Sequence, residues 1–283
     1  MPSLKEIKNR VGSVQNTLKI TSAMKLVASS KLRRAQQAIE AMRPYEKALL
    51  DILSHLLAVE GAAPRADESR AEGGGTAIVA FASNSSLCGA FNANAVRKAL
   101  QQIEEAEGPV TVFSIGRKMV DAMKKTGHPS PADFSAVSER PAYAPMADLA
   151  QSLMEAFADG RYSRVVLVYN HFVSTARQEP VTETLLPLAA VAGQEASQMP
   201  PDVILEPSAQ ELIMALQPKS VKLRLYAALL DSVAAEHAAR TVAMQMATDN
   251  GNDLLQELVL QYNKSRQQKI TSEILDLAGG QQQ

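Results

Sequence analysis

A heptad spacing of mostly apolar side chains runs through residues 3–57. Apolar residues recur at alternating steps of three and four, and 13 of the 16 positions in this seam are apolar. Such a seam is typical of a long helix that supercoils with a partner, because burial of the apolar face supplies most helical stability. Ser3 and Glu6 have the spacing of a capping box at its start. The seam comprises Leu4, Ile7, Val11, Val14, Leu18, Thr21, Lys25, Ala28, Leu32, Ala35, Ile39, Met42, Glu46, Leu49, Leu53 and Leu56.

A second helical pattern begins after Pro207 and persists to about residue 278, with a looser seam. Its segment Thr248–Asp253 is polar and contains Gly and Asn, so we expect it to pack on something other than the first helix. We also expect a bend at Pro44 and a kink or short break at Pro218. If the two helices pair, the direction of the chain makes them antiparallel. The longer second helix is then expected to protrude beyond the start of the first.

Between these two helical patterns the apolar residues recur with a different period. Residues 58–75 contain clustered Gly and predict an exposed linker, residues 76–190 alternate between strand and helix patterns, and residues 191–207 predict a loop. This alternation is typical of a small α/β domain with a largely parallel sheet. The predicted fold class is an α/β domain inserted between two long terminal helices (1–57 and 208–283) that form an antiparallel coiled coil. The expected strands are Thr76–Ala82, Val110–Ile115, Asp133–Val137, Arg164–Phe172 and Thr182–Leu188, and the expected helices are Phe91–Ala106, Arg117–Thr126 and Met146–Ala158.

Charge is spread unevenly along a chain whose net charge is −1. Residues 3–57 hold ten Lys and Arg against four acids, which predicts an acidic partner surface for the first helix. Lys31, Arg33 and Arg34 form the tightest basic cluster, and this cluster is either a solvated helix face or a contact with an acidic protein. Nucleic acid is the weaker interpretation, because no aromatic residues lie nearby and the chain is almost neutral.

The best candidate for chemistry is the loop that follows the first expected strand. Residues 85–92 (SSLCGAFN) stand where α/β folds bind phosphate, but the chain has no GxGxxG or GxxxxGK[ST] motif, so a tight turn is favoured. Cys88, the only cysteine, fits a reducing compartment, and no local motif supplies the base that a nucleophile needs. The four histidines lack metal-ligand spacing. We therefore expect no metal, no cofactor and, since no apolar run is long enough, no membrane insertion.

Short motifs at both ends of the chain, together with the turn around Cys88, form a specific pattern. The motifs at the N-terminal end are Lys5-Glu6-Ile7, Ser13-Val14-Gln15-Asn16-Thr17, Lys19-Ile20-Thr21, Ala23-Met24, Val27-Ala28, Ser30-Lys31 and Arg43-Pro44-Tyr45. Those further along are Leu87-Cys88-Gly89, Asn92, Glu236-His237-Ala238-Ala239-Arg240, Met244, Ala247-Thr248-Asp249-Asn250, Tyr262-Asn263-Lys264, Arg266-Gln267 and Ile270-Thr271-Ser272-Glu273. On these residues the chain resembles the gamma-subunit family of F-type ATP synthases, whose members form the central rotor stalk, and the resemblance covers nearly the whole chain.

The resemblance implies a non-catalytic subunit that couples proton-driven rotation to the catalytic beta subunits. It implies a coiled coil inside a ring of three alpha and three beta subunits, an epsilon-subunit partner, and an α/β foot on the membrane c-ring. The location implied is the cytoplasmic face of the bacterial inner membrane, without insertion and without nucleic acid. The resemblance implies contacts with beta-subunit loops at Met24, Lys25, Lys31, Arg33 and Arg34. It implies polar contacts along the shaft at Arg240 and Gln267, and contacts near the tip of the shaft at Thr271, Glu273, Ile274 and Leu277. The implied contacts with the c-ring are Ile204 and Glu206.

Two other functions remain open on the residues alone. A scaffold or adaptor would use the coiled coil only to bring partners together, and a small-molecule enzyme would use the α/β domain. Under the rotor interpretation Lys25 breaks the seam because its side chain points outward to a partner, and a fully buried Lys25 would contradict this prediction.

Overall fold

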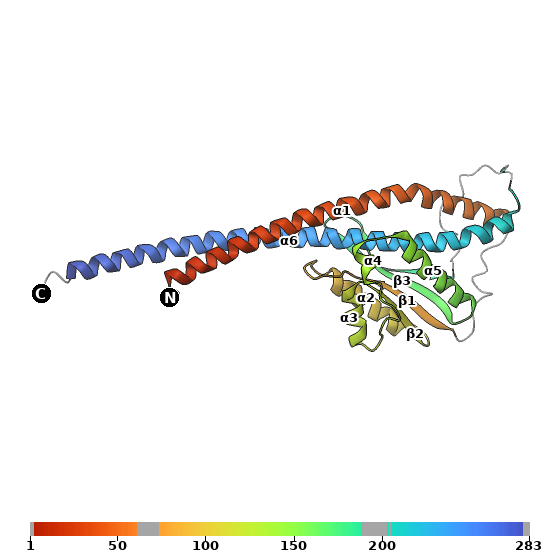
Figure 1. The fold of residues 1–283 in the computed structure, drawn as a ribbon, viewed down its shortest axis with the longest axis horizontal. Coiled ribbons are helices and arrows are strands. Elements are labelled where there is room, and N and C mark those ends of the chain that lie inside the picture. Colours follow the sequence, from red (N-terminus) through yellow and green to blue (C-terminus); the bar gives the residue numbers. More distant parts are fainter. Residues whose placement is uncertain (1–2, 61–73, 188–202, 204, 280–283) are drawn as a thin grey trace. The chain divides into compact units, whose positions relative to one another are not determined.

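A computed structural model of the protein describes residues 3–60, 74–187, 203 and 205–279. Two long helices, α1 (Leu4–Glu60) and α6 (Ala209–Gly279), flank the other elements in sequence (Figure 1). Contacts divide the chain into two compact units: Met1–Ala28 with Arg240–Gln283, here called the helical unit, and Ser29–Ala239, here called the α/β unit. The elements between the helices are β1 (Gly75–Phe81), α2 (Phe91–Glu105), β2 (Val110–Ile115), α3 (Arg117–Lys125), α4 (Ser135–Glu139), α5 (Tyr143–Ala158), β3 (Tyr162–Phe172) and β4 (Gln178–Leu186).

The two long helices pair antiparallel, which confirms the predicted fold class. In the helical unit Thr21 contacts Thr248 and Lys25 contacts Gln245, so residue numbers on α6 fall as those on α1 rise. In the α/β unit Leu53 packs with Leu223 in one apolar cluster. The predicted linker 58–75 includes residues 61–73 and the predicted loop 191–207 includes 191–202 and 204, all outside the described residues. The division of the chain into domains at these segments stays a prediction.

The start of α1 has the predicted capping box. The Ser3 amide donates to Glu6 Oε2 (2.9 Å), and the Glu6 amide donates to Ser3 Oγ (3.3 Å). These reciprocal bonds satisfy two of the backbone donors that a helix start leaves without partners.

Pro44 lies inside α1 and Pro218 lies inside α6, and neither residue interrupts its helix. The short break considered at Pro218 is therefore wrong. A proline in a helix removes one backbone hydrogen bond, but burial on both sides of it can hold the helix together. Leu216 and Leu223, on either side of Pro218, both pack in the cluster that α1 contributes to through Leu49 and Leu53.

The sheet has the strand order β2-β1-β3-β4. β1 pairs in parallel with both β2 and β3, with Ile78 opposite Val112 on one side and Val166 on the other. β4 pairs antiparallel with β3 and forms an edge of the sheet. The predicted, largely parallel sheet is confirmed, and β4 is its one antiparallel strand among the described residues.

The strand expected at Asp133–Val137 is wrong, because Ser135–Glu139 forms the short helix α4. Asp133 Oδ1 accepts a hydrogen bond from the Ser135 amide (2.8 Å), and this side-chain contact to the backbone favours a turn over an extended chain. Val137, which contributed to the strand pattern, is buried in the core as a helical residue.

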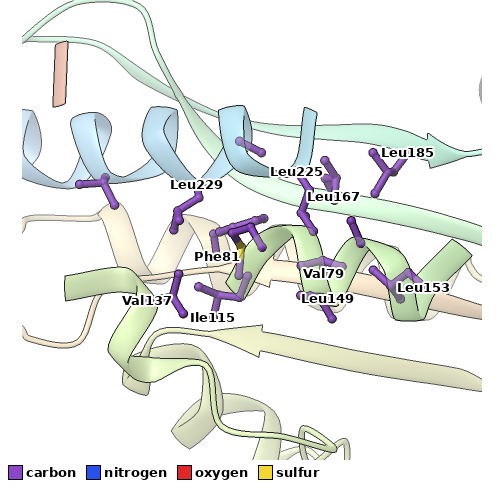
Figure 2. Close-up of a cluster of buried hydrophobic side chains, with 14 of the residues drawn as sticks. Val79, Phe81, Ile115, Val137, Leu149, Leu153, Leu167, Leu185, Leu225 and Leu229 are labelled. Atoms are coloured by element: carbon purple, nitrogen blue, oxygen red, sulfur yellow. The ribbon is translucent and has the colours of Figure 1, made fainter. Parts of the chain in front are cut away.

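Two apolar cores cover the two faces of the sheet. The core between the sheet, α2 and α3 includes Ile78, Val166, Ala95 and Met119. The other core brings α5 and α6 onto the opposite face, and α1 contributes Leu32 and Ala35 to it. Figure 2 shows this second core, with Leu225 and Leu229 of α6 directed toward Phe81 and Leu167 of the sheet. Within the α/β unit, α6 is thus one layer of the domain as well as a partner of α1.

Candidate functional site

In the helical unit α1 and α6 meet at a layer of small and polar side chains. Thr21 Oγ1 and Thr248 Oγ1 lie 2.9 Å apart, and Thr248 Oγ1 also donates to the Met244 carbonyl (2.8 Å). A Cβ built at Gly251 would lie 2.7 Å from Leu18 Cδ2, so the two helices approach closely there. The expectation that Thr248–Asp253 packs on something other than the first helix is wrong at these positions, because small residues let the helix backbones come together.

Lys25 faces the other helix. Its Nζ donates to Gln245 Oε1 (2.7 Å), and Gln245 Nε2 in turn donates to both carboxylate oxygens of Asp249 (2.8 and 2.9 Å). Lys25 is half-buried, so its side chain is neither enclosed nor directed freely outward. Its role toward a partner stays a prediction. Sequence reasoning did not find Gln245 and Asp249, although the polar break in the apolar seam at Lys25 was the signal for them.

Large apolar side chains lie on the surface of this same unit. On α1, Ile20, Leu26 and Val27 are 57–68% exposed, while Met24 beside them is half-buried. On α6, the exposed apolar residues are Met246, Leu254, Val259, Leu260, Ile270, Ile274 and Leu275. Isolated apolar side chains on a surface are ordinary, but this many on two slender helices indicate a surface that a partner covers.

The end of α6 extends past the start of α1, as predicted (Figure 1). Residues 266–275 are all exposed, Gln267 and Ile274 among them. Thr271 Oγ1 donates to the Gln267 carbonyl (2.9 Å), and Glu273 forms an exposed ion pair with Lys269 (3.7 Å). Leu277 lies within the helix, but its side chain is outside what the structure describes. Arg240, expected as a polar contact with a partner, is mostly buried within the chain.

The basic residues of α1 are almost all exposed. Of the ten Lys and Arg between residues 3 and 57, only Lys25 is half-buried. The cluster Lys31, Arg33 and Arg34 is exposed in the α/β unit, next to the buried Leu32 and Ala35. Within the described part of the chain these three side chains have no ion-pair partner, so their charge is available to an acidic surface.

The loop between β1 and α2 is closed by its own hydrogen bonds. Asn92 Oδ1 accepts from both the amide and the hydroxyl of Ser83 (3.0 Å each), and the Ser83 hydroxyl lies 2.6 Å from the Ser85 carbonyl. Asn92 Nδ2 also donates to Cys88 Sγ (3.2 Å). These contacts join the side chains of the loop to one another, which agrees with the interpretation as a tight turn.

Cys88 itself is 1% exposed and packs with Phe91 and with Ala235 of α6. A thiol buried among apolar groups acts as a small hydrophobic residue, and a substrate cannot reach it. Among the described residues, no group of three or more His, Cys, Asp or Glu could hold a metal ion.

The residues expected at the foot are only partly visible. Glu206 is exposed, and Ile204 lies outside the described residues. None of the helices in the described part of the chain combines the length and the apolar character that crossing a bilayer requires.

Similarity to known proteins extends over the whole chain. A family model described as ATP synthase matches residues 3–282. The chain is 47% identical over 286 residues to the ATP synthase gamma chain of Phocaeicola vulgatus, covering 99% of each protein. It is 46% identical over 302 residues to the ATP synthase gamma chain of Bacteroides thetaiotaomicron, covering 100% of each.

Solved structures have a similar fold. One chain of the Euglena gracilis mitochondrial ATP synthase superposes with a TM-score of 0.66 at 22% identity, covering 98% of this chain and 93% of that one. One chain of the central stalk and c-ring of the Tetrahymena thermophila mitochondrial ATP synthase superposes with a TM-score of 0.56 at 22% identity, covering 81% and 99%.

Proposed function

The chain belongs to the gamma-subunit family of F-type ATP synthases, the central-stalk rotors, and we propose that it transmits rotation without itself carrying out chemistry. Rotation of a membrane c-ring would turn the helical pair, and the turning pair would drive the catalytic beta subunits through states of different nucleotide affinity. The loop at Cys88 supports the non-catalytic part of this proposal, because Ser83, Asn92 and Cys88 bond to one another and the Cys88 thiol is buried.

The observation that carries the proposal is the surface of the helical unit. Its exposed apolar residues suit an apolar sleeve, in which contact is non-directional and therefore compatible with turning. The exposed lysines and arginines of α1 suit acidic loops on the surrounding ring, because electrostatic attraction steers a surface without fixing one geometry. A rotor has to meet equivalent surfaces in turn, and both kinds of contact allow this.

The proposed partners are three alpha and three beta subunits, an epsilon subunit and the c-ring, at the cytoplasmic face of a bacterial inner membrane. The proposed contacts with beta-subunit loops are Met24, Lys25, Lys31, Arg33 and Arg34. Those of the shaft and its tip are Arg240, Gln267, Thr271, Glu273, Ile274 and Leu277, and those with the c-ring are Ile204 and Glu206.

Truncation of α6 tests the rotor proposal. We would assemble the complete ATP synthase with a chain that ends at Ala239, and with a second chain that ends at Leu260 and keeps the contacts of Thr248 and Gly251 with α1. After reconstitution into vesicles, the shorter chain is expected to abolish proton-driven ATP synthesis, and the longer chain is expected to retain part of it. Undiminished synthesis with both chains would contradict a rotating shaft.

A cross-linking experiment separates a rotor from an adaptor. A photoreactive amino acid in place of Leu260, which is 70% exposed, would link α6 to the surrounding ring on illumination. We expect ATP hydrolysis to fall in proportion to the cross-linked fraction, with the illuminated wild-type complex as the control. An adaptor would keep its full rate of hydrolysis after cross-linking.

A further inference from the structure

A polar pocket of about 190 Å³ lies where α1, α6 and the β3–β4 pair meet inside the α/β unit. Apart from the exposed Arg43, its lining residues do not belong to the surfaces assigned above. Charged and polar side chains from all four elements face it. They are Arg43 and Glu46 of α1, Tyr169 and His171 of β3, Glu183 of β4, and Arg224 and Asp231 of α6.

Asp231 holds the end of β3. Its Oδ1 accepts a hydrogen bond from the Phe172 amide (3.0 Å), and its Oδ2 is paired with His171 Nδ1. The side chain of Asp231 is mostly buried, and burial raises the pKa of its carboxyl, although the bonds from His171 and Phe172 counteract this shift. A buried carboxylate with both oxygens bonded fixes the position of the strand relative to the helix.

Arg224 holds β4 in the same way, about two helical turns earlier on the same face of α6. Its guanidinium forms an ion pair with Glu183 Oε1, with Nε at 3.1 Å, and its Nη2 reaches the Thr184 carbonyl (3.4 Å). Glu183 uses its second oxygen to accept the Tyr169 hydroxyl (3.1 Å). α6 thus contacts β3 and β4 through directional bonds at two points.

These bonds differ in kind from the apolar contacts beside them. Leu225 and Leu229 bury α6 on the sheet, and their close packing is non-directional, so that directional bonds add to the resistance against sliding or turning. Among the strands that the structure describes, β4 pairs with β3 alone, so the sheet holds β4 along one of its edges. Charge-assisted hydrogen bonds have preferred angles and distances, and they resist such motion.

We propose that Arg224 and Asp231 are positioning residues that clamp the β3–β4 pair to α6, so that torque passes between the sheet and the long helix without slippage. This inference rests on the proposed rotor function and adds to it the residues that join foot to shaft. Glu46 of α1 lies near the Glu183 and Asp231 carboxylates, and Arg224 and Arg43 offset part of this repulsion, so α1 contributes charge to the pocket without forming the clamp.

The test compares Asp231→Ala with Asp231→Asn in the complete complex reconstituted into vesicles. The carboxamide oxygen of Asn can still accept a hydrogen bond from the Phe172 amide. Ala removes both bonds that Asp231 forms, those with Phe172 and His171. We expect Asp231→Ala to lower the ratio of ATP-driven proton pumping to ATP hydrolysis by about twofold or more, and Asp231→Asn to restore most of it. Asp148→Ala, an exposed aspartate of α5, is the matched control and is expected to keep the wild-type ratio.

Hydrogen exchange on the purified chain gives an independent measurement. The Phe172 amide is expected to exchange about tenfold faster in Asp231→Ala than in the wild type, and at close to the wild-type rate in Asp231→Asn. If Asp231→Ala fails to assemble, Glu183→Gln, which keeps the shape of the Arg224 contact and removes its charge, is expected to lower the pumping ratio in its place.

An unchanged pumping ratio in assembled Asp231→Ala or Glu183→Gln complexes would overturn the clamp. Failure of the rotor proposal gives a different result. Vesicles with the wild-type complex would then pump protons no better than vesicles with a complex that lacks this chain.

Discussion

The same two helices meet different surroundings in the two units of this chain. In the helical unit α1 and α6 touch through Thr21 and Thr248, Lys25 and Gln245, and Leu18 against Gly251, and they leave large apolar side chains exposed. In the α/β unit the helices are packed into an apolar core with the sheet, and every residue of α6 between 220 and 240 is at least half-buried.

This difference in burial gives each long helix two roles, one in the stability of the α/β unit and one in contacts with partners. Burial in a core fixes a helix in one place, whereas a thin polar layer with an apolar exterior leaves a helix pair free to meet other surfaces. Stability should therefore reside in the α/β unit, and changes to the helical unit should affect partners more than folding. Substitutions in each unit test this contrast.

The largest effect is expected at Gly116, in the turn between β2 and α3. An added Cβ would lie 2.0 Å from the Ala82 carbonyl oxygen, and the residue has φ +93°. Gly116→Ala is expected to destabilise the α/β unit by on the order of 4 kcal/mol, because backbone on both sides has to shift. Chemical denaturation of the purified chain measures this loss. Gly127→Ala is the control, since φ is +84° but no atom lies within 4 Å, and it should cost only about 1 kcal/mol.

A matched pair of leucines on α6 compares the units directly. Leu225 is fully buried in the core, whereas Leu260 is 70% exposed in the helical unit. Leu225→Ala is expected to cost about 2–5 kcal/mol of unfolding free energy, because it leaves a cavity. Leu260→Ala should stay within about 0.5 kcal/mol in the purified chain. Similar losses at both positions, again by denaturation, would remove the distinction between the units.

A smaller effect is expected where the helices approach most closely. Gly251→Ala places a Cβ 2.7 Å from Leu18 Cδ2, a flexible side chain that can move aside. The crowding and the better helix propensity of Ala oppose each other, so the net change should be within about 1 kcal/mol. In a Leu18→Ala background the crowding is gone, and the same substitution should stabilise by up to about 1 kcal/mol. A double-mutant cycle on thermal unfolding measures this coupling, and strict additivity would contradict the contact.

The smallest effect concerns Glu46, the acidic break in the apolar seam of α1. Burial, followed by the nearby Glu183 carboxylate, raises the pKa of its carboxyl. A carboxyl with a raised pKa binds its proton more tightly in the folded chain, so its ionised form weakens folding at neutral pH and this penalty fades as pH falls. Because Glu46 is only half-buried, Glu46→Gln should raise Tm at pH 7 by less than about 3 °C, and by less still near pH 4.5. A larger gain at acid pH would reverse the sign of this prediction.

The regular parts of the fold could be predicted from local patterns. The seam of α1, the capping box of Ser3 and Glu6, and the strands around Ile78 and Val166 each follow a short-range rule of burial or capping. α4 was missed because a single Asp133 contact to the backbone outweighed the strand pattern of five residues. The loose seam of α6 has a physical reason as well. The helix is buried by α1 on one side and by the sheet and α5 on the other, so its apolar residues do not lie in one stripe.

The polar contacts could be predicted only in part. Thr21, Lys25 and Glu46 stood out as exceptions in the seam, and all three face polar groups. Their partners could not be identified, because a polar side chain on a distant segment leaves no periodic signal. The same holds for the clamp, in which Arg224 and Glu183 are 41 residues apart on different elements.

The contact between Thr21 and Thr248 also sets a condition on how the chain is made. The two residues are 227 positions apart, so at about 5–20 residues per second a ribosome needs roughly 10–50 s to supply the second after the first. Throughout that interval the apolar seam at the start of α1 has emerged without the helix that covers it. A nascent chain of this kind should depend on chaperones that shield its first segment. The first aggregates to form should be held together by contacts between the uncovered N-terminal helices.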